Sequence, residues 1–257
     1  MKKQLFTLFL AAATTFVGCK DDNDTIPDVD KPGKLLSKIT ETEDGVSTVY
    51  NLTYDNNKRL TSYKEQNNTE SANFTYDANG NITKLEFVEG EGKSVIEVTY
   101  NNGVPASAKF RSDSDDIEDD VIFTYKLANN QVTEITQKLG TLEYGKATIT
   151  YQNGNVAKVV SVITLPEGED LEEVPNLNTT LTYAYGSKKN MFPNAGFKFI
   201  LDPMGLSARF FAKNEIVSEK IEGIFDATTT YQYTYDSDGY PLTGTDSDGV
   251  TYKYEYK

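Results

Sequence analysis

Carboxylates and hydroxyls are the reactive side chains that this sequence has in quantity. The 257 residues contain no histidine and one cysteine, Cys19. The usual general base and the commonest metal ligand are therefore missing, which excludes Ser-His and Cys-His catalysis and tetrahedral zinc sites. No glycine-rich phosphate loop follows a predicted strand and opens a helix. The sequence therefore predicts a protein that is not an enzyme, with no catalytic residues and no cofactor.

Paired carboxylates are the one catalytic arrangement left, because glycoside hydrolases need only two of them. With 39 Asp and Glu residues, some pair must lie at a suitable distance by chance, and the sequence singles out none. The chain has no Trp, a common sugar-stacking residue, although its 17 Tyr could stack on a sugar instead. A carboxylate-based glycoside hydrolase is therefore the weakest of the functions considered.

Three acidic segments have a composition that could bind calcium. One is SDSDDIEDD, Ser112 to Asp120, and the others are the two DSDG sequences at Asp236–Gly239 and Asp246–Gly249. Calcium takes six to eight oxygen ligands, often from Asp-rich loops. However, neither DSDG is followed by the remaining ligands and the terminal Glu of an EF-hand loop. The sequence favours two hairpin turns and one solvated loop, and it predicts no metal site.

The single cysteine has a different chemistry, since it closes an export signal. Lys2 and Lys3 precede an apolar run from Leu5 to Val17, which is shorter than the about 20 residues that a membrane span needs. The sequence FVGC that ends at Cys19 resembles a bacterial lipobox, with Phe16 where Leu is usual. That resemblance implies a signal peptide over 1–18 and a lipid on the Cys19 sulfur. The alternative is an ordinary secreted protein with one unused thiol.

Residues 19–34 read as an acidic tether with two prolines, which cannot bury enough apolar surface to fold. Lys20-Asp21-Asp22 resembles the acidic export tag of Bacteroidetes lipoproteins, which implies the outer face of the outer membrane; the alternative is a merely solvated tether. Cleavage before Cys19 would change the net charge from −14 to −16, with 23 basic and 39 acidic residues left. A surface this negative repels nucleic acid. The predicted partners are the membrane, through the anchor, and a glycan or protein.

A repeat of Tyr, a short Asp/Asn/Gly run and an aliphatic residue organises the rest of the chain. Its first five tyrosines lie 22 to 26 residues apart, which is the length of two strands and two turns. Asn102-Gly103 and Asn153-Gly154 suit two-residue turns, because both residue types tolerate positive φ. With such turns we expect four aromatic–aliphatic cross-strand pairs. These are Tyr54 with Leu60, Tyr76 with Ile82, Tyr125 with Val132, and Tyr151 with Val156.

The predicted fold is all-β, as one domain over residues 35–257. Strands alternate with period 2: Ile96, Val98 and Tyr100 share one face, and the other face is mostly polar. An antiparallel meander of about 16 strands is too wide for a flat sheet, so it should curl into a barrel or half-barrel. The Phe-rich stretch at about 190–214, interrupted by Pro203, breaks the alternation. We expect it to fill the concave side; the alternative is a lid over one open end.

Together these features carry a family resemblance. The hairpins, such as FTYDANG from Phe74 to Gly80, resemble YD/RHS-type repeats. The lipobox, the acidic tether, the hairpins and the Phe-rich insert together resemble a Bacteroidetes lipoprotein family of unknown function with a porin-like fold. The resemblance implies a many-stranded barrel or near-barrel and implies no activity.

Two functions remain from this reading. The first is a surface-anchored, non-catalytic binding or scaffold module for a glycan, a peptide or an envelope partner. The second is a carrier that holds a lipid or other apolar ligand in the concave side of the sheet. Because the apolar face is read as inward, the domain without its anchor should dissolve without detergent. Two tyrosine trios could form contact platforms, but their alternate spacing favours core packing: Tyr231, Tyr233 and Tyr235, and Tyr252, Tyr254 and Tyr256.

Overall fold

The computed structural model describes residues 33–113, 120–164, 178–192, 195–205, 207–223 and 225–257. The predicted signal peptide over 1–18, the lipidated Cys19 and nearly all of the tether lie outside the described residues. Most of the acidic segment from Ser112 to Asp120 lies outside them as well.

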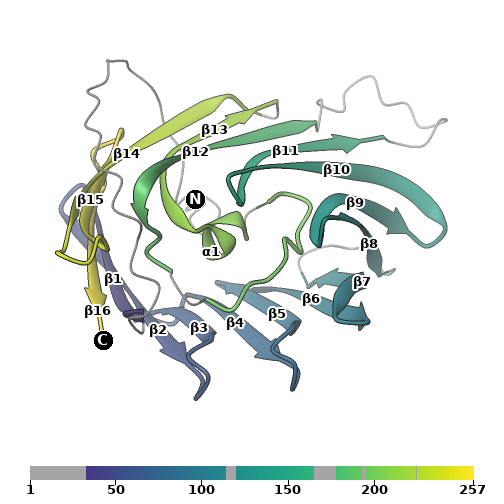
Figure 1. The fold of residues 1–257 in the computed structure, drawn as a ribbon, viewed down its shortest axis with the longest axis horizontal. Helices are drawn as coiled ribbons and strands as arrows, with labels where there is room; N and C mark the ends of the chain where they lie inside the picture. The colour runs from purple at the N-terminus through teal and green to yellow at the C-terminus, as the bar shows by residue number, and fades with distance from the viewer. Residues whose placement is uncertain (1–32, 114–119, 165–177, 193–194, 206, 224) are drawn as a thin grey trace.

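The described residues form sixteen strands and one short helix, α1 (Ala208–Phe211). Every strand pairs antiparallel with its neighbour in the chain, and β1 pairs with β16, so the meander closes into a barrel. Figure 1 shows the strands as a ring around α1. The predicted strand number and order are confirmed, and the sheet closes fully. The strands are β1 (Leu36–Glu43), β2 (Val46–Tyr54), β3 (Leu60–Glu65), β4 (Glu70–Tyr76), β5 (Ile82–Glu89), β6 (Gly92–Asn101), β7 (Val104–Ser112), β8 (Val121–Ala128), β9 (Gln131–Leu139), β10 (Leu142–Gln152), β11 (Asn155–Ile163), β12 (Thr179–Lys189), β13 (Asn214–Glu222), β14 (Ala227–Tyr235), β15 (Pro241–Asp246) and β16 (Thr251–Tyr256).

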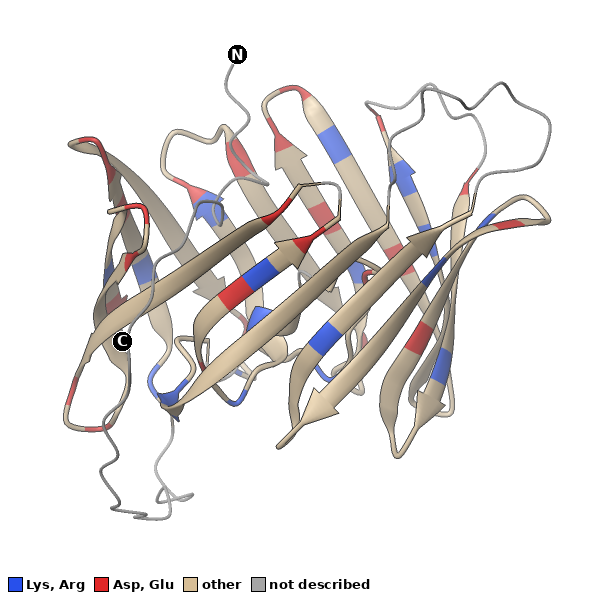
Figure 2. Ribbon diagram, turned by 90° about the horizontal axis from the view of Figure 1, so that it is seen from above, with Lys and Arg blue, Asp and Glu red and all other residues tan. Residues whose placement is uncertain are grey.

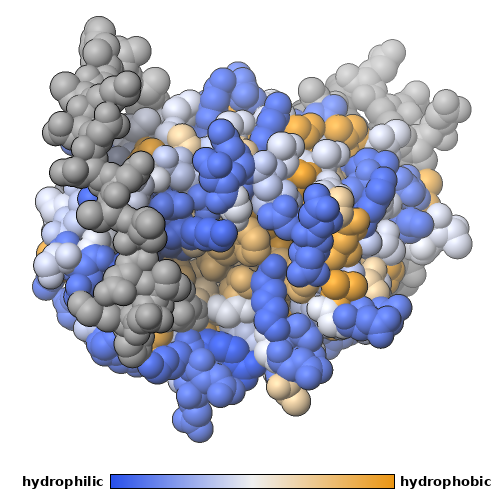
Figure 3. Space-filling model, in the orientation of Figure 1, coloured by the Kyte–Doolittle hydropathy of each residue, from blue (hydrophilic) through white to orange (hydrophobic). Residues whose placement is uncertain are grey.

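Alternation of side chains sets the inside and the outside of the barrel. In β6, Ile96 and Val98 are buried in the core, whereas Glu97 and Thr99 are exposed. In β14, Tyr231 is buried and its neighbours on the chain are exposed. Because period 2 puts successive residues on opposite faces, the apolar residues face inward as predicted. Seen along the barrel in Figure 3, hydrophobic atoms gather in the middle and hydrophilic side chains surround them.

Three of the four predicted cross-strand pairs are confirmed. Tyr54 lies opposite Leu60, Tyr76 opposite Ile82, and Tyr151 opposite Val156. In each hairpin the register shifts by one residue next to the tyrosine, because the partner strand carries an extra residue there: Thr61, Thr83 or Ala157.

The predicted pair of Tyr125 with Val132 is wrong. Tyr125 lies opposite Ile135, and Leu127 takes the place opposite Val132. The reason is the turn: Asn129 and Asn130 both adopt positive φ, +51° and +60°, and close a two-residue loop. The strand β8 therefore continues three residues past Tyr125. Leu127 occupies the position that the tyrosine occupies in the other three hairpins.

The aspartate that follows many of the tyrosines has a local role. The Oδ1 atom of Asp77 accepts hydrogen bonds from the backbone N–H groups of Asn79 and Asn81, at 2.9 and 2.8 Å. Such a carboxylate mimics a backbone turn and tolerates few replacements. The same two-bond pattern recurs at three other turns, at Asp55, Asp236 and Asp246.

Candidate functional site

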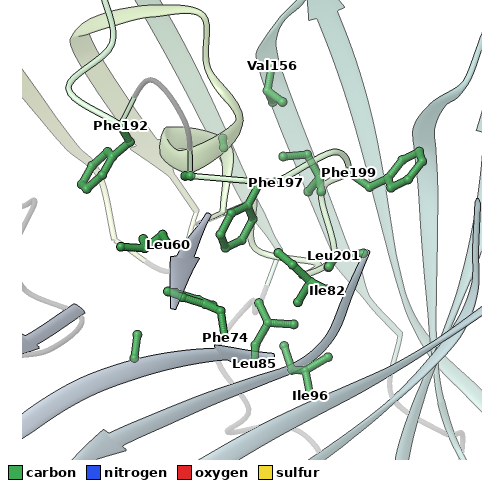
Figure 4. Packing of buried hydrophobic residues seen from close by; sticks show 14 of the residues in the cluster. Leu60, Phe74, Ile82, Leu85, Ile96, Val156, Phe192, Phe197, Phe199 and Leu201 are labelled. Carbon is green, nitrogen blue, oxygen red and sulfur yellow. The ribbon is translucent and has the colours of Figure 1, made fainter. Parts of the chain in front are cut away.

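The insert between β12 and β13 fills one end of the barrel, which we call the closed end. Ile200 and Leu201 are 0 % and 1 % exposed, and Phe197 is 8 % exposed. Figure 4 shows the ring of Phe197 facing Phe74 of β4, with the ring centroids 5.1 Å apart in an edge-to-face contact. The same ring stacks on Phe210 of α1 at 4.9 Å. The predicted filling of the concave side is therefore confirmed, and the alternative of a lid is wrong.

Tyrosine hydroxyls hold the insert to the wall. Tyr76 donates a hydrogen bond to the carbonyl of Ala195 at 2.8 Å, and Tyr125 donates one to the carbonyl of Leu201 at 2.8 Å. Tyr183 donates to Gly205 at 3.0 Å. The insert has little regular structure of its own, so these bonds satisfy backbone carbonyls that would otherwise be buried without a partner.

The repeated tyrosine also joins each hairpin to the preceding one. Its hydroxyl donates to a backbone carbonyl at or near the start of the adjacent strand, and the bonds are 2.7 to 3.0 Å long. Sequence analysis predicted the aliphatic partners of Tyr54, Tyr76 and Tyr151 but not this ladder of hydrogen bonds, because the acceptor is a carbonyl that any residue supplies. The ladder consists of Tyr54 to Leu36, Tyr76 to Leu60, Tyr100 to Ile82, Tyr151 to Val132, Tyr185 to Val156 and Tyr233 to Ile216.

A buried ion pair lies inside the barrel, where sequence analysis predicted none. Arg209 of α1 lies 3.1 Å from Glu219 of β13, and Glu219 is 6 % exposed. Burial raises the pKa of Glu219, and the guanidinium of Arg209 opposes this rise. The hydroxyl of Tyr231 donates to the same carboxylate at 3.5 Å. One signal was available in the sequence: Arg209 is the only charged residue of the helix ARFF.

The two tyrosine trios proposed as contact platforms point into the barrel. Tyr231, Tyr252 and Tyr254 are buried, and Tyr231 stacks on Tyr233 with centroids 6.0 Å apart. Tyr252 donates to Asp246 at 2.9 Å. Core packing, which the alternate spacing favoured, is therefore their use.

Inward-facing carboxylates gather toward the opposite end, which we call the open end. Glu65, Glu70 and Asp246 are each 9 % exposed, and Glu70 accepts a hydrogen bond from Tyr50 at 3.2 Å. Burial, reinforced by neighbouring acidic groups, raises the pKa of Glu41 to about 7. Burial likewise raises the pKa of Glu70 to about 7. Among the described residues, one carboxylate oxygen of Glu41 is buried without a hydrogen-bond partner.

These carboxylates are not arranged as a metal site. Within the described ranges, no group of three or more His, Cys, Asp or Glu side chains could hold a metal ion. The two DSDG segments form the turns after β14 and β15, where Asp236 and Asp246 bind backbone N–H groups. Their side chains therefore have a turn-forming role, as the sequence favoured.

The outer wall is polar along the strands. Lys38 on β1 lies 2.8 Å from Glu255 on β16, and Lys84 on β5 lies 2.8 Å from Glu86 on the same strand. Exposed threonines cover the neighbouring positions of β14 and β16. Further ion pairs on this wall join Lys93 to Glu86, Lys109 to Asp120, Arg111 to Asp120, Lys146 to Glu134, Lys220 to Glu222 and Lys253 to Glu255.

Two hollows lie at the barrel wall. One of about 410 Å³ opens between β15 and β16, whose pairing is confined to Thr243–Thr245 and Thr251–Lys253. Leu242 and Tyr254 contribute to its lining. The other, of about 190 Å³, lies on the outer face of β2 and β3.

Two solved structures have a similar fold. A porin-like protein from Bacteroides uniformis matches with a TM-score of 0.50 and 15 % identity, over 86 % of this chain and 98 % of that one. A porin-like protein from Bacteroides vulgatus matches with a TM-score of 0.51 and 11 % identity, over 88 % and 99 %. No model of a known protein family matches the chain, and no curated protein does. The porin-like fold implied by the resemblance is thereby confirmed as a fold.

Within the described part of the chain, no helix is long and apolar enough to cross a membrane.

Proposed function

We propose that this chain is a lipid-anchored, non-catalytic lipoprotein of the outer membrane that acts as a binding or scaffold module on the cell surface. Cys19 would carry the lipid, residues 20–34 would be the tether, and the barrel from Leu36 to Tyr256 would stand in water. The partner would be a glycan, a peptide or another envelope component. Membership of the lipoprotein family and the YD/RHS origin of the hairpins belong to this proposal.

The observation that carries the proposal is the outer wall. A barrel that crosses a bilayer needs an outward apolar band, and Lys or Arg facing lipid at the midplane costs about 2–4 kcal/mol each. This barrel instead carries exposed ion pairs such as Lys38–Glu255 and Lys220–Glu222, together with exposed threonines. With such a wall in water, a separate lipid anchor supplies the attachment, and two or three acyl chains suffice for it.

The filled lumen argues against two alternatives. Ile200 and Leu201 are almost fully buried where a channel or an apolar ligand would have to run. A carrier would therefore have to expel the insert, which three tyrosine hydroxyls hold. The buried Glu70 and Asp246 are hydrogen-bonded to tyrosines of the core. These two carboxylates therefore do not favour the glycoside hydrolase alternative.

Acylation and water solubility are tested together. We expect the full-length protein, expressed in a host with a lipoprotein pathway, to incorporate a labelled fatty acid and to fractionate with the outer membrane. The variant Cys19→Ser should lose the label and appear in the soluble fraction. We also expect residues 33–257, which include both strands of the closing pair, to be monodisperse without detergent. Recovery of this domain only in detergent micelles would refute the proposal.

Binding is tested on the same domain. Glycan arrays and pull-downs from outer-membrane extract should give a partner that survives competition with an unrelated acidic protein. A bound lipid found by native mass spectrometry of freshly purified protein would favour the carrier instead.

A further inference from the structure

The two ends of the barrel carry opposite charge. At the closed end, the turns, the insert and the last two residues of each adjoining strand carry nine basic residues and seven acidic ones, a balance of +2, although the whole chain is −14. Figure 2 shows basic residues in the loops of the lower end and acidic ones crowding the upper end. The basic residues are Lys34, Lys58, Arg59, Lys188, Lys189, Lys198, Arg209, Lys213 and Lys257, and the acidic ones are Asp55, Asp77, Asp202, Glu215, Asp236, Asp238 and Glu255.

Most of these lysines make no ion pair with another described residue, although Lys188 interacts electrostatically with Glu215 and Lys198 with Asp77. Lys34 pairs with Asp236 and Asp238, and Arg59 pairs with Asp55. The ion pairs among the described residues include none of the other six lysines. On the outer wall, in contrast, seven lysines pair with Glu or Asp. Lys198 donates to the carbonyl of Asn79, and Lys189 and Lys257 lie over the rings of Tyr240 and Tyr54. These neutral partners leave the lysines their charge, which can act on an external anion.

The position of the chain entry points to what that anion is. The first described strand, β1, starts at Leu36, so the described chain enters the barrel at the closed end. The tether from Cys19 to Lys34 can span at most about 50 Å when extended. A lipid on Cys19 would thus be joined to the barrel at its closed end, and the shortest path from the bilayer to the barrel ends there.

We infer that the closed end is a docking surface for the anionic bilayer to which the chain is anchored, with its lysines bound to lipid phosphate groups. This inference rests on the proposed function, since it needs the anchor to present this end to the membrane. Each Lys near an anionic surface strengthens binding by about fivefold. The acidic open end lies about 20–25 Å away, as strands of this length tilted in a barrel give. That is more than two Debye lengths at physiological salt, so its repulsion is screened.

Vesicle sedimentation tests the surface without the anchor. The mature chain with Cys19→Ser, which has no lipid, is mixed with vesicles containing 30 % phosphatidylglycerol or with pure phosphatidylcholine vesicles. We expect binding to the anionic vesicles only, and its loss at 0.5 M salt. The triple variant Lys58→Gln, Lys188→Gln, Lys213→Gln should reduce the partition coefficient by about 100-fold, from three losses of about fivefold.

A matched triple variant controls for net charge. Lys64→Gln, Lys138→Gln, Lys158→Gln removes the same charge from the outer wall and should change the partition coefficient less than twofold. Equal losses in both triples, or no preference for anionic vesicles in the parent chain, would overturn the inference. Concentration-dependent self-association in place of vesicle binding would do the same, since it would assign the lysines to the acidic end of a second copy. Acylation of Cys19 is measured in a separate experiment. The docking inference can therefore fail while the lipid anchor is confirmed, and the reverse.

Discussion

The closed and open ends are built from the same strands and differ in what lies between them. At the closed end, tyrosine hydroxyls bind backbone carbonyls, and the insert packs at near-zero exposure against the wall. At the open end, inward positions hold carboxylates such as Glu41 and Glu70, whose pKa values burial raises to about 7. We therefore expect the closed end to contribute most to the stability of the barrel and the open end to contribute most to its pH dependence.

The largest effect is expected from truncating the core of the insert. Leu201→Ala removes a side chain that is 1 % exposed and leaves a cavity, so the free energy of unfolding should fall by about 3–5 kcal/mol. The matched Leu139→Ala, at a half-buried position near the open end, should cost about 1 kcal/mol. Urea denaturation followed by tyrosine fluorescence measures both. Equal losses of unfolding free energy in the two variants would contradict the contrast between the two ends.

A smaller effect is expected from removing one hydroxyl that holds the insert. Tyr125→Phe keeps the ring but leaves the buried carbonyl of Leu201 without its donor, which should cost about 1–2 kcal/mol. Tyr144→Phe, on the half-buried tyrosine at the start of β10, is the matched control and should cost less than about 0.5 kcal/mol. If Tyr125→Phe is as neutral as this control, the hydroxyl of Tyr125 does not stabilise the insert.

The carboxylates of the open end should make the free energy of unfolding depend on pH. The folded pKa of Glu41, about 7, lies above the about 4.3 of an unfolded glutamate, so the folded state binds the proton more tightly. Its contribution to stability is therefore full below about pH 4.3 and is lost as pH rises to about 7. Glu41→Gln should raise the free energy of unfolding at pH 8 by about 1 kcal/mol, discounted for its exposed fraction, and leave it unchanged at pH 4.

Thermal denaturation from pH 4 to pH 8 measures this change. The matched variant Glu91→Gln, at the exposed turn between β5 and β6, should leave the profile unchanged. A gain for Glu41→Gln that is the same at every pH would place its cause outside proton binding.

The outer wall between the two ends should give the smallest effect. Lys220→Ala breaks an ion pair whose two side chains are 49 % and 47 % exposed, and solvent screens such pairs. We expect a loss below about 0.5 kcal/mol in the same urea titration. A loss above 1 kcal/mol would mean that the wall stabilises the barrel as strongly as the hydroxyls of the closed end.

Much of the fold was predictable because its signals are local. Period-2 alternation in segments such as β6, together with Asn-Gly turns such as Asn153-Gly154, predicted the antiparallel strands and their number. The same local signals failed for the hairpin of Tyr125, because Asn129-Asn130 closes a two-residue turn like Asn153-Gly154 but lies two residues further from its tyrosine. The candidate site was less predictable. Arg209 and Glu219 are ten residues apart in a segment without a repeat, and only the folded insert brings them together.

By itself, the sequence determined the all-β class, the hairpin units and which face of each strand is apolar, because neighbouring residues decide these properties. Tertiary structure alone decided that β1 meets β16 and that Glu41 lies near Asp246. It also decided that the unpaired lysines share one end. These features depend on closure, which joins positions more than 200 residues apart, and no pattern within a strand encodes the partner that a distant strand will supply.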